Sequence, residues 1–276
     1  MEIKDISIVI TTYKSENKIY NCLNSLPKLA KIIVVENSKD EKFKEEILKR
    51  YPHIDCILTG GNKGYSVANN IGLSKVTTNF ALILNPDTIV GEKTFDNFLI
   101  QAKIFPDFWL MGPVTDEFNN VLLKKDIFET NYIKGHAMFF NVKKFNNIFF
   151  DENYFLYLEE IDLCKRVLRN KGKIYQVSTI NVDHEGARSV QANSELELEK
   201  NRNWHWMWST FYFNKKHKGF VLALIVVIPK LLSSFAKFIF FSLMRNNKKS
   251  NIYFCRLSGL INSILGKKSW YRPSID

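Results

Sequence analysis

The sequence lacks the glycine-rich motifs with which common nucleotide-binding enzymes hold phosphate groups. No G-x-G-x-x-G occurs, which excludes the ordinary dinucleotide-binding domain, and no G-x-x-x-x-G-K-[ST] occurs, which excludes P-loop kinases and ATPases. If this chain binds a nucleotide, we therefore expect strand ends and a metal ion to hold it.

Cysteine is scarce, and its spacing carries no motif. No C-x-x-C pair and no Cys/His pair at zinc spacing occurs among Cys22, Cys56, Cys164 and Cys255. This pattern indicates reduced thiols in a cytosolic chain. The pattern of a signal peptide is also missing, because Glu2 and Asp5 interrupt a basic region and the apolar run Ile6–Ile10 is too short.

Acidic residues are almost absent from the last part of the chain. Twelve of the 39 basic residues follow Asn214, with Asp276 as the single acid, so this stretch carries the whole net charge of +11. The preceding part is neutral, which argues against a nucleic-acid-binding protein, since such a protein spreads basic residues over a folded face. The charge predicts an anionic surface as partner, with a membrane as the first candidate.

The first half alternates short apolar runs with helical patterns. A chain of 276 residues with 46% hydrophobic residues can bury a large core. The pattern predicts an α/β fold with a doubly wound, mostly parallel sheet. The expected strands are Ile6–Thr11, Lys31–Glu36, Cys56–Thr59 and Phe80–Leu84, and the expected helices are Glu16–Leu26, Glu41–Arg50 and Gly64–Leu73. We expect this domain to cover residues 1–200 and an aromatic, basic, helical region to cover 201–276.

Each expected strand ends in polar residues, as ligand sites of such sheets do. These ends are Thr11-Thr12-Tyr13, Glu36-Asn37-Ser38, Gly60-Gly61-Asn62 and Asn85-Pro86-Asp87. Any one of them alone is explained by an ordinary turn. Their coincidence at four neighbouring strands favours a binding site.

Two further polar groups stand out in the less regular second half. Glu159, Glu160 and Asp162 begin the expected helix within Tyr157–Arg169, where capping alone explains one acid but not three. The segment Asp183-His184-Glu185-Gly186 places a histidine between two acids.

Seven segments, in order, resemble family 2 glycosyltransferases with the GT-A fold, in the bacterial rhamnosyltransferase-like subgroup. The resemblance runs from about Ile6 to Lys218. Its segments are SIVITTYKSENKIYNCLNSL, VVENSKD, NKGYSVANNIGL, LILNPDT, GHAMFF, FDENYFLYLEEIDLCKRV and DHEGARS.

The resemblance implies a nucleotide-sugar site that uses Mg²⁺ or Mn²⁺. Asp87 stands in the D-x-D-like metal motif with Asn85, and His184 is expected near the metal or the donor diphosphate. The residues implied in contacts with the base, ribose or phosphates are Thr12, Tyr13, Glu36, Asn62, Lys63, Gly64 and Asn69.

The resemblance implies Glu160 as the catalytic base, with Glu159 and Asp162 as alternatives. Glu160 and Glu36 stand where the family usually has aspartate. At a helix start we expect backbone N–H groups to lower the pKa of Glu160, and we expect Tyr154, Phe155 and Tyr157 to stack on an acceptor sugar.

The apolar stretch Phe220–Met244 is long enough to span a bilayer, but Pro229, Lys230 and Lys237 interrupt it. A lysine at the centre of a span costs roughly 2.5–3.5 kcal/mol. We therefore expect two interfacial helices, followed by a basic amphipathic segment at Ile252–Trp270. A buried hairpin and a true span are the alternatives. The aromatic residues expected at headgroup level are Trp204, Trp206, Trp208, Phe211, Tyr212 and Phe213.

The leading functional prediction is an inverting glycosyltransferase on the cytoplasmic face of the bacterial inner membrane. It would transfer a sugar, with L-rhamnose from dTDP-rhamnose as the first choice, to a lipid-linked or growing cell-surface glycan. The alternative is a catalytically inactive relative that acts as a membrane-bound binding subunit.

Overall fold

A computed structural model describes residues 1–114, 126–146, 149–184 and 195–272. The chain forms two compact units, each described here by itself. The first, called the body, comprises residues 1–151 and 160–191, and the second, called the helical unit, comprises 152–159 and 192–276. The expected domain boundary at residue 200 lies inside a helix of the helical unit. Glu185 and Gly186, singled out in the sequence, lie outside the described residues.

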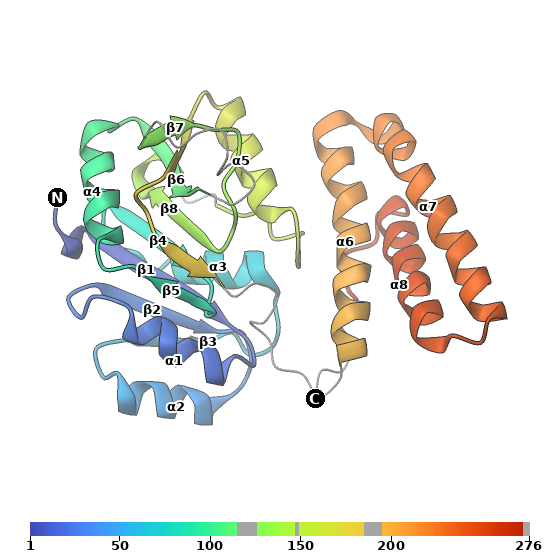
Figure 1. The fold of residues 1–276 in the computed structure, drawn as a ribbon, viewed down its shortest axis with the longest axis horizontal. Coiled ribbons are helices and arrows are strands. Elements are labelled where there is room, and N and C mark those ends of the chain that lie inside the picture. The colour runs from blue at the N-terminus through green and yellow to red at the C-terminus, as the bar shows by residue number, and fades with distance from the viewer. Residues whose placement is uncertain (115–125, 147–148, 185–194, 273–276) are drawn as a thin grey trace. The chain divides into compact units, whose positions relative to one another are not determined.

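The body is built on an eight-stranded sheet in the order β3-β2-β1-β4-β8-β6-β9-β7 (Figure 1). Strands β3, β2, β1 and β4 run parallel, and β8 runs antiparallel to both of its neighbours. The strands are β1 (Ile6–Thr12), β2 (Lys31–Glu36), β3 (Asp55–Leu58), β4 (Phe80–Leu84), β6 (Phe108–Pro113), β7 (Ile127–Glu129), β8 (Ala137–Asn141) and β9 (Lys173–Val177).

Helices cover both faces of this sheet, because its central strands are apolar on both sides. Alternate residues of β1 belong to different cores: Ile8 and Ile10 face α1, α2 and α4, while Val9 faces α3 and α5. The helices are α1 (Glu16–Asn24), α2 (Glu41–Arg50), α3 (Tyr65–Leu73), α4 (Thr94–Ile104) and α5 (Glu159–Arg169). The predicted doubly wound, mostly parallel α/β sheet is confirmed.

A small two-stranded ribbon stands apart from the large sheet. Strand β5 (Thr88–Val90) follows β4 almost directly and pairs antiparallel with β10 (Val182–His184). The register places His184 opposite Thr88. The ribbon therefore returns the late segment Val182–His184 to the end of β4, next to the Asn85-Pro86-Asp87 turn.

The helical unit consists of α6 (Glu195–Lys218), α7 (Phe220–Leu243) and α8 (Asn247–Ile264). Helices α7 and α8 form an antiparallel hairpin, in which Ser242 and Ser250 share a hydrogen bond of 2.7 Å. Helix α8 lies directly on α6 at Gly259, where an added Cβ atom would come within 2.2 Å of the Trp204 carbonyl oxygen.

Two expectations about this region are wrong. Helix α7 is one helix rather than two. It runs without a break from Phe220 to Leu243, and the exposed Pro229 lies inside it. Trp204, Trp208 and Phe211 are buried among the three helices and do not form a headgroup belt, although Trp206 is exposed. Within the described part of the chain, only α7 is long and apolar enough to cross a membrane.

Candidate functional site

Three predicted site residues meet where β4 ends. The Nε2 atom of His184 lies 3.3 Å from Asp87 Oδ1 and 3.3 Å from Asn85 Nδ2. The Asp87 side chain is fully buried, whereas His184 remains partly exposed. The β5–β10 ribbon brings them together.

A second histidine, His136, belongs to this cluster and was not predicted. Its ring stacks on His184 with a centroid distance of 4.7 Å and an interplanar angle of 8°, and its carbonyl accepts the Asn85 N–H at 3.0 Å. Burial lowers the pKa of His136 to about 4, and the neighbouring His184 acts in the same direction. His136 is therefore neutral at physiological pH. The only sequence signal was its place in the GHAMFF segment.

Glu160 lies beside the residue that precedes His136. A Cβ atom added at Gly135 would meet the Cβ and Cγ atoms of Glu160 at 3.7 Å and the Tyr65 hydroxyl at 3.3 Å. Tyr65 donates a hydrogen bond of 2.6 Å to the Gly135 carbonyl and holds this segment in place. The segment Gly135-His136 thus has the aliphatic part of the Glu160 side chain beside its first residue and the His184 ring on its second.

The expectation that the helix start lowers the pKa of Glu160 is wrong. Burial raises the pKa of this carboxyl group, and hydrogen bonds from the backbone at Glu160 and Ile161 oppose the rise without cancelling it. The N–H groups act as expected, but the loss of water around the side chain outweighs them. A raised pKa makes the ionised carboxylate a stronger base.

The two alternative acids occupy different surroundings. Asp162 is fully buried and accepts a hydrogen bond from Arg166 Nε at 2.9 Å, an ion pair that ties it to its own helix. Glu159 is also buried and belongs to the helical unit. The residues just before it, Tyr157 and Leu158, have φ angles of 73° and 68°, a conformation that costs non-glycine residues about 1–3 kcal/mol each.

The expected acceptor platform is wrong for two of its three aromatic residues. Tyr154 is buried against Tyr212, with ring centroids 4.9 Å apart, and Phe155 stacks on His205 at 4.4 Å. Both rings are packed inside the helical unit and are not exposed for stacking on a sugar. Tyr157 is partly exposed and meets Trp206 edge-on at 5.5 Å.

Asn37 organises the predicted phosphate-binding loop after β3. Its Oδ1 accepts hydrogen bonds from the Lys63 N–H at 2.9 Å and the Thr59 hydroxyl at 3.0 Å, and its Nδ2 donates to Asn62 Oδ1 at 3.1 Å. Asn62 Oδ1 also accepts the Gly64 N–H at 3.1 Å. Asn62 and Lys63 are therefore held in one network, and Gly64, with a φ of 87°, begins α3.

Polar residues lie at the end of β1 and on the side of α3 that contacts it. Asn69 is fully buried and accepts a hydrogen bond from the Thr11 hydroxyl at 3.1 Å. Thr12 is buried, and its hydroxyl has no hydrogen-bond partner among the described residues. Tyr13 is partly exposed and accepts the Ser15 hydroxyl through its carbonyl at 3.0 Å.

Glu36 is buried at the end of β2. Burial raises the pKa of Glu36 to about 7, a hydrogen bond from Ser38 opposes the rise, and Glu16 and Asp40 add to it. A carboxyl group that titrates near neutrality can donate a hydrogen bond as well as accept one.

The donor set at the end of β4 fits a divalent cation that also binds substrate. Asp87 offers a carboxylate and His184 an imidazole, and no group of three or more His, Cys, Asp or Glu side chains suited to a metal occurs among the described residues. Mg²⁺ is commonly bound by one or two carboxylates together with substrate phosphates and water. Carboxylate and water are the ligands that suit Mg²⁺ and Mn²⁺ best, whereas imidazole is a better ligand for softer metals.

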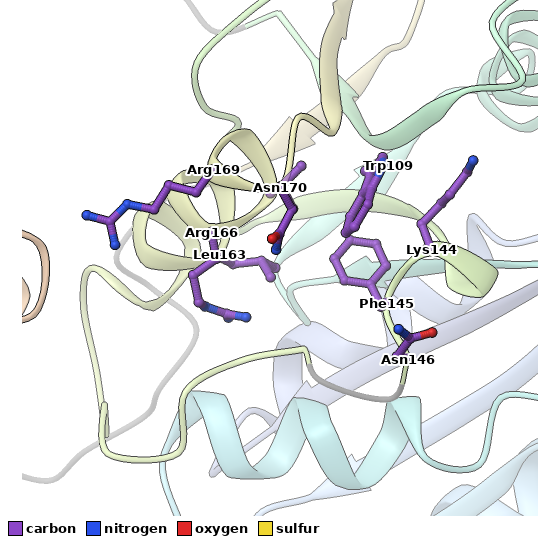
Figure 2. A pocket seen from close by; sticks show the side chains of 9 residues that line it. Trp109, Lys144, Phe145, Asn146, Leu163, Arg166, Arg169 and Asn170 are labelled. Atoms are coloured by element: carbon purple, nitrogen blue, oxygen red, sulfur yellow. The ribbon is translucent and has the colours of Figure 1, made fainter.

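A separate cavity of about 550 Å³ lies at the other end of α5 (Figure 2). Trp109 and Phe145 lie on one side of it and Arg166 on the other, the Arg169 side chain points away from the two rings, and Lys144 lies at its edge. Arg166 donates hydrogen bonds to Asp162 and to the Phe149 carbonyl. Its guanidinium group therefore stabilises this part of the fold. This cavity contains none of the predicted site residues.

Comparison with known proteins identifies the family. Residues 7–163 match the family model described as glycosyl transferase family 2, more than half of the chain. The chain belongs to this family. This match contains every predicted site residue except His184.

Two curated relatives are similar over about two thirds of the chain. The low-salt glycan biosynthesis hexosyltransferase Agl10 of Haloferax volcanii is 26% identical over 213 residues, which are 65% of this chain and 67% of the relative. The N-acetylglucosaminyl-diphospho-decaprenol L-rhamnosyltransferase of Mycobacterium tuberculosis is 20% identical over 236 residues, which are 67% of this chain and 77% of the relative. These relatives support the rhamnosyltransferase-like subgroup.

Two solved structures share the fold. The mannosyltransferase PcManGT from Pyrobaculum calidifontis, in complex with GDP-Man and Mn²⁺, aligns with a TM-score of 0.57 and 14% identity over 96% of this chain and 88% of the other. TarS 1-349 from S. aureus, in complex with UDP, aligns with a TM-score of 0.53 and 15% identity over 97% and 93%. The predicted GT-A fold is confirmed.

Proposed function

We propose that the protein is an inverting glycosyltransferase that moves one sugar from a nucleoside diphosphate to a glycan acceptor. The observation that carries the proposal is the pair Asp87–His184 with the His136 ring stacked on it, together with Glu160, whose side chain lies beside Gly135, the residue before His136. A site for the diphosphate and a base for the acceptor hydroxyl thus lie at two ends of one short segment.

Asp87 and His184 are the residues that would hold Mg²⁺ or Mn²⁺ in this proposal. A divalent cation there would neutralise the negative charge of the diphosphate leaving group. PcManGT was solved with GDP-Man and Mn²⁺, which supports the same class of donor and metal here. Neutral His136 supports His184 by stacking without adding positive charge.

Glu160 removes the proton of the acceptor hydroxyl in the proposed reaction. A single attack at the anomeric carbon inverts its configuration, so the reaction needs no carboxylate nucleophile. The raised pKa strengthens the base, and a general base of this kind typically contributes ~10²–10⁴ in rate. Asp162, already paired with Arg166, and Glu159 are the weaker choices.

The loop organised by Asn37 and the ends of β1 and β2 would bind the nucleotide. Thr12, Tyr13 and Glu36 are proposed against the base and ribose, and Asn62, Lys63, Gly64 and Asn69 near the phosphates. Two observations support this assignment: the buried Thr12 hydroxyl has no hydrogen-bond partner among the described residues, and the raised pKa of Glu36 lets its carboxyl group donate a hydrogen bond as well as accept one. L-rhamnose from dTDP-rhamnose is the proposed donor, with support from the M. tuberculosis relative.

The acceptor is proposed to be a glycan on a lipid diphosphate at the cytoplasmic face of the inner membrane. The same relative is named for a diphospho-decaprenol acceptor, a molecule that cannot leave the bilayer. Helix α7 exposes apolar side chains along its length, and basic residues stand at both of its ends. Both features favour attachment of the helical unit to a membrane.

A panel of nucleotide sugars with Mg²⁺ or Mn²⁺ tests the proposal. A ligand at 100 times its dissociation constant stabilises the folded state by roughly 2.7 kcal/mol, which a thermal shift detects. We expect one donor class to bind and to be hydrolysed slowly in the presence of metal. Metal-dependent binding without hydrolysis or transfer would favour the inactive binding subunit instead.

A further inference from the structure

A groove runs along the seam between α7 and α8. Its volume is about 540 Å³, within the range of small-molecule sites, and its wall is mostly aliphatic and aromatic. Leu231, Leu232, Phe235 and Phe238 contribute one row from α7, and Phe254, Leu257 and Ile261 contribute a facing row from α8. Leu232, Phe235 and Phe254 each keep more than half of their surface exposed.

The polar side chains of the wall already have hydrogen-bond partners within the protein. Ser258 Oγ accepts the indole N–H of Trp204 at 3.1 Å, and Asn262 donates to the Ser258 carbonyl at 2.8 Å. The Asn262 side-chain oxygen accepts the indole N–H of Trp270 at 3.1 Å. This stretch of the groove therefore suits an apolar chain rather than a headgroup.

The opposite end of the seam, at the α7–α8 turn, is cationic. Beyond Phe238, the rings of Phe241 and Tyr253 stack at 5.6 Å. The ammonium group of Lys237 lies 5.5 Å from the Tyr253 ring centroid, and that of Lys249 lies 5.0 Å from the Phe241 centroid. The whole hairpin, residues 220–264, contains no acidic residue. Each ring of the pair thus holds one lysine by a cation–π contact, which keeps positive charge at this end of the hairpin.

We propose that this groove binds the lipid of the acceptor: one long apolar chain between α7 and α8, with its phosphate or diphosphate against Lys237 and Lys249. The inference rests on the proposed function, since it names where the lipid of that acceptor is held. The single seam between two helices matches one chain rather than the two chains of a phospholipid. Inside a bilayer a groove gains no hydrophobic advantage over the surrounding tails, so packing and the charged end supply the selectivity.

The test uses the full chain in phosphatidylcholine nanodiscs and a polyprenyl phosphate that carries a diazirine near its phosphate. After irradiation, mass spectrometry locates the labelled residues. We expect labels within 237–241 and 249–254, next to the proposed position of the phosphate. Leu232→Trp with Ile261→Trp fills the groove and should lower labelling about fivefold, whereas the matched control Val221→Trp, on an exposed part of α7 outside the groove, should not. Near-wild-type thermal unfolding verifies that each variant folds.

The charged end is tested separately. Lys237→Gln with Lys249→Gln should weaken binding about 30-fold, since each lysine near a lipid surface contributes roughly 1 kcal/mol. Lys230→Gln, an exposed lysine of α7 outside the lining, is the control. Excess unlabelled polyprenyl phosphate should remove the label, and the matching uncharged polyprenol should compete poorly.

Three results would overturn the inference. Equal competition by phosphatidylglycerol would show a general anionic lipid contact. Even labelling along the exposed side of α7 would show only contact with the bilayer, and crosslinks between two copies of the chain would show a dimer interface. Labelling is repeated in Glu160→Gln, which is expected to capture the lipid without turnover. If the wild-type protein captures the lipid specifically but never hydrolyses or transfers a sugar, the proposed function is wrong and the lipid site remains.

Discussion

His184 lies 3.3 Å from the carboxylate of Asp87, although the two residues are far apart in the sequence. The antiparallel pairing of β5 with β10 brings the two residues together, because Asp87 directly precedes β5 and His184 ends β10. A carboxylate and an imidazole thus meet at the carboxyl end of β4.

Replacement of Asp87 tests this pair directly. Asp87→Ala should weaken Mn²⁺-dependent donor binding by at least about 100-fold, since even residues behind a metal ligand typically contribute 10–100-fold. Titration calorimetry with and without Mn²⁺ measures the effect. Asp183→Ala, an exposed acid on the same ribbon, is the matched control. Unchanged donor affinity in Asp87→Ala with metal present would remove Asp87 from the site.

Replacement of Glu160 separates catalysis from binding. Glu160→Gln should reduce kcat by roughly 10²–10⁴ and leave donor affinity nearly unchanged, because the carboxylate acts mainly in the transition state. The ionised carboxylate is the active form, and its pKa is raised. The rising limb of kcat against pH should therefore lie above that of an ordinary glutamate.

The neighbouring acids are the controls for Glu160. Asp162→Asn should chiefly lower stability, because it leaves Arg166 without its buried ion-pair partner. Glu159→Gln should retain turnover. If Glu160→Gln turns over normally while Glu159→Gln does not, the base has been assigned to the wrong residue.

Glu36 should make stability depend on pH. Its folded-state pKa of about 7 is above the unfolded value of 4.5, so its contribution is fully present below pH 4.5 and is lost as pH rises through 7. The loss amounts to about 3 kcal/mol at most. Glu36→Gln should therefore raise Tm at pH 8 by several degrees and change it little at pH 4.5. An equal shift at both pH values would show that charge at Glu36 is not the cause.

Membrane attachment should depend on the exposed side of α7. Ile225 and Ile228 both lie there, and aspartate at such positions costs up to roughly 3 kcal/mol each in a membrane. Ile225→Asp with Ile228→Asp should shift the protein from the membrane fraction to the soluble fraction. Ile100→Asp, on an exposed position of α4, should leave the distribution unchanged. A double variant that stays in the membrane fraction after a high-salt wash would contradict attachment through α7.

The regular first half of the fold could be predicted because its strands are continuous apolar runs. Strands β2 and β4 and helix α2 have the predicted bounds. Strands β6 and β9 and helix α4 were missed because the second half has no comparable alternation, and β5 and β10 because three residues carry no detectable period. His136 was missed as a member of the site for the same reason, since only the pairing of β4 with β8 brings it there.

The helical unit was misjudged for a different reason. Pro229 predicts a helix break when only local geometry is considered, yet α7 tolerates it on an exposed side. The tryptophans of α6 resemble an interfacial belt in sequence. Gly259 shows why they are inside: α8 approaches so closely that Trp204 is covered completely.

The register of the β5–β10 ribbon has a consequence for how the chain tolerates insertions and deletions. Asn181 anchors the ribbon, since its carbonyl accepts the Gly91 N–H at 2.9 Å and the Thr94 hydroxyl at 2.8 Å. A slip of one residue would turn every side chain of β10 to the opposite face and offer Asp183 in place of His184. Two carboxylates would then face each other beside Asn85, and the charge of the pair proposed to hold the metal would change by a full unit. A single-residue insertion in this ribbon is thus expected to act as severely as loss of His184 itself.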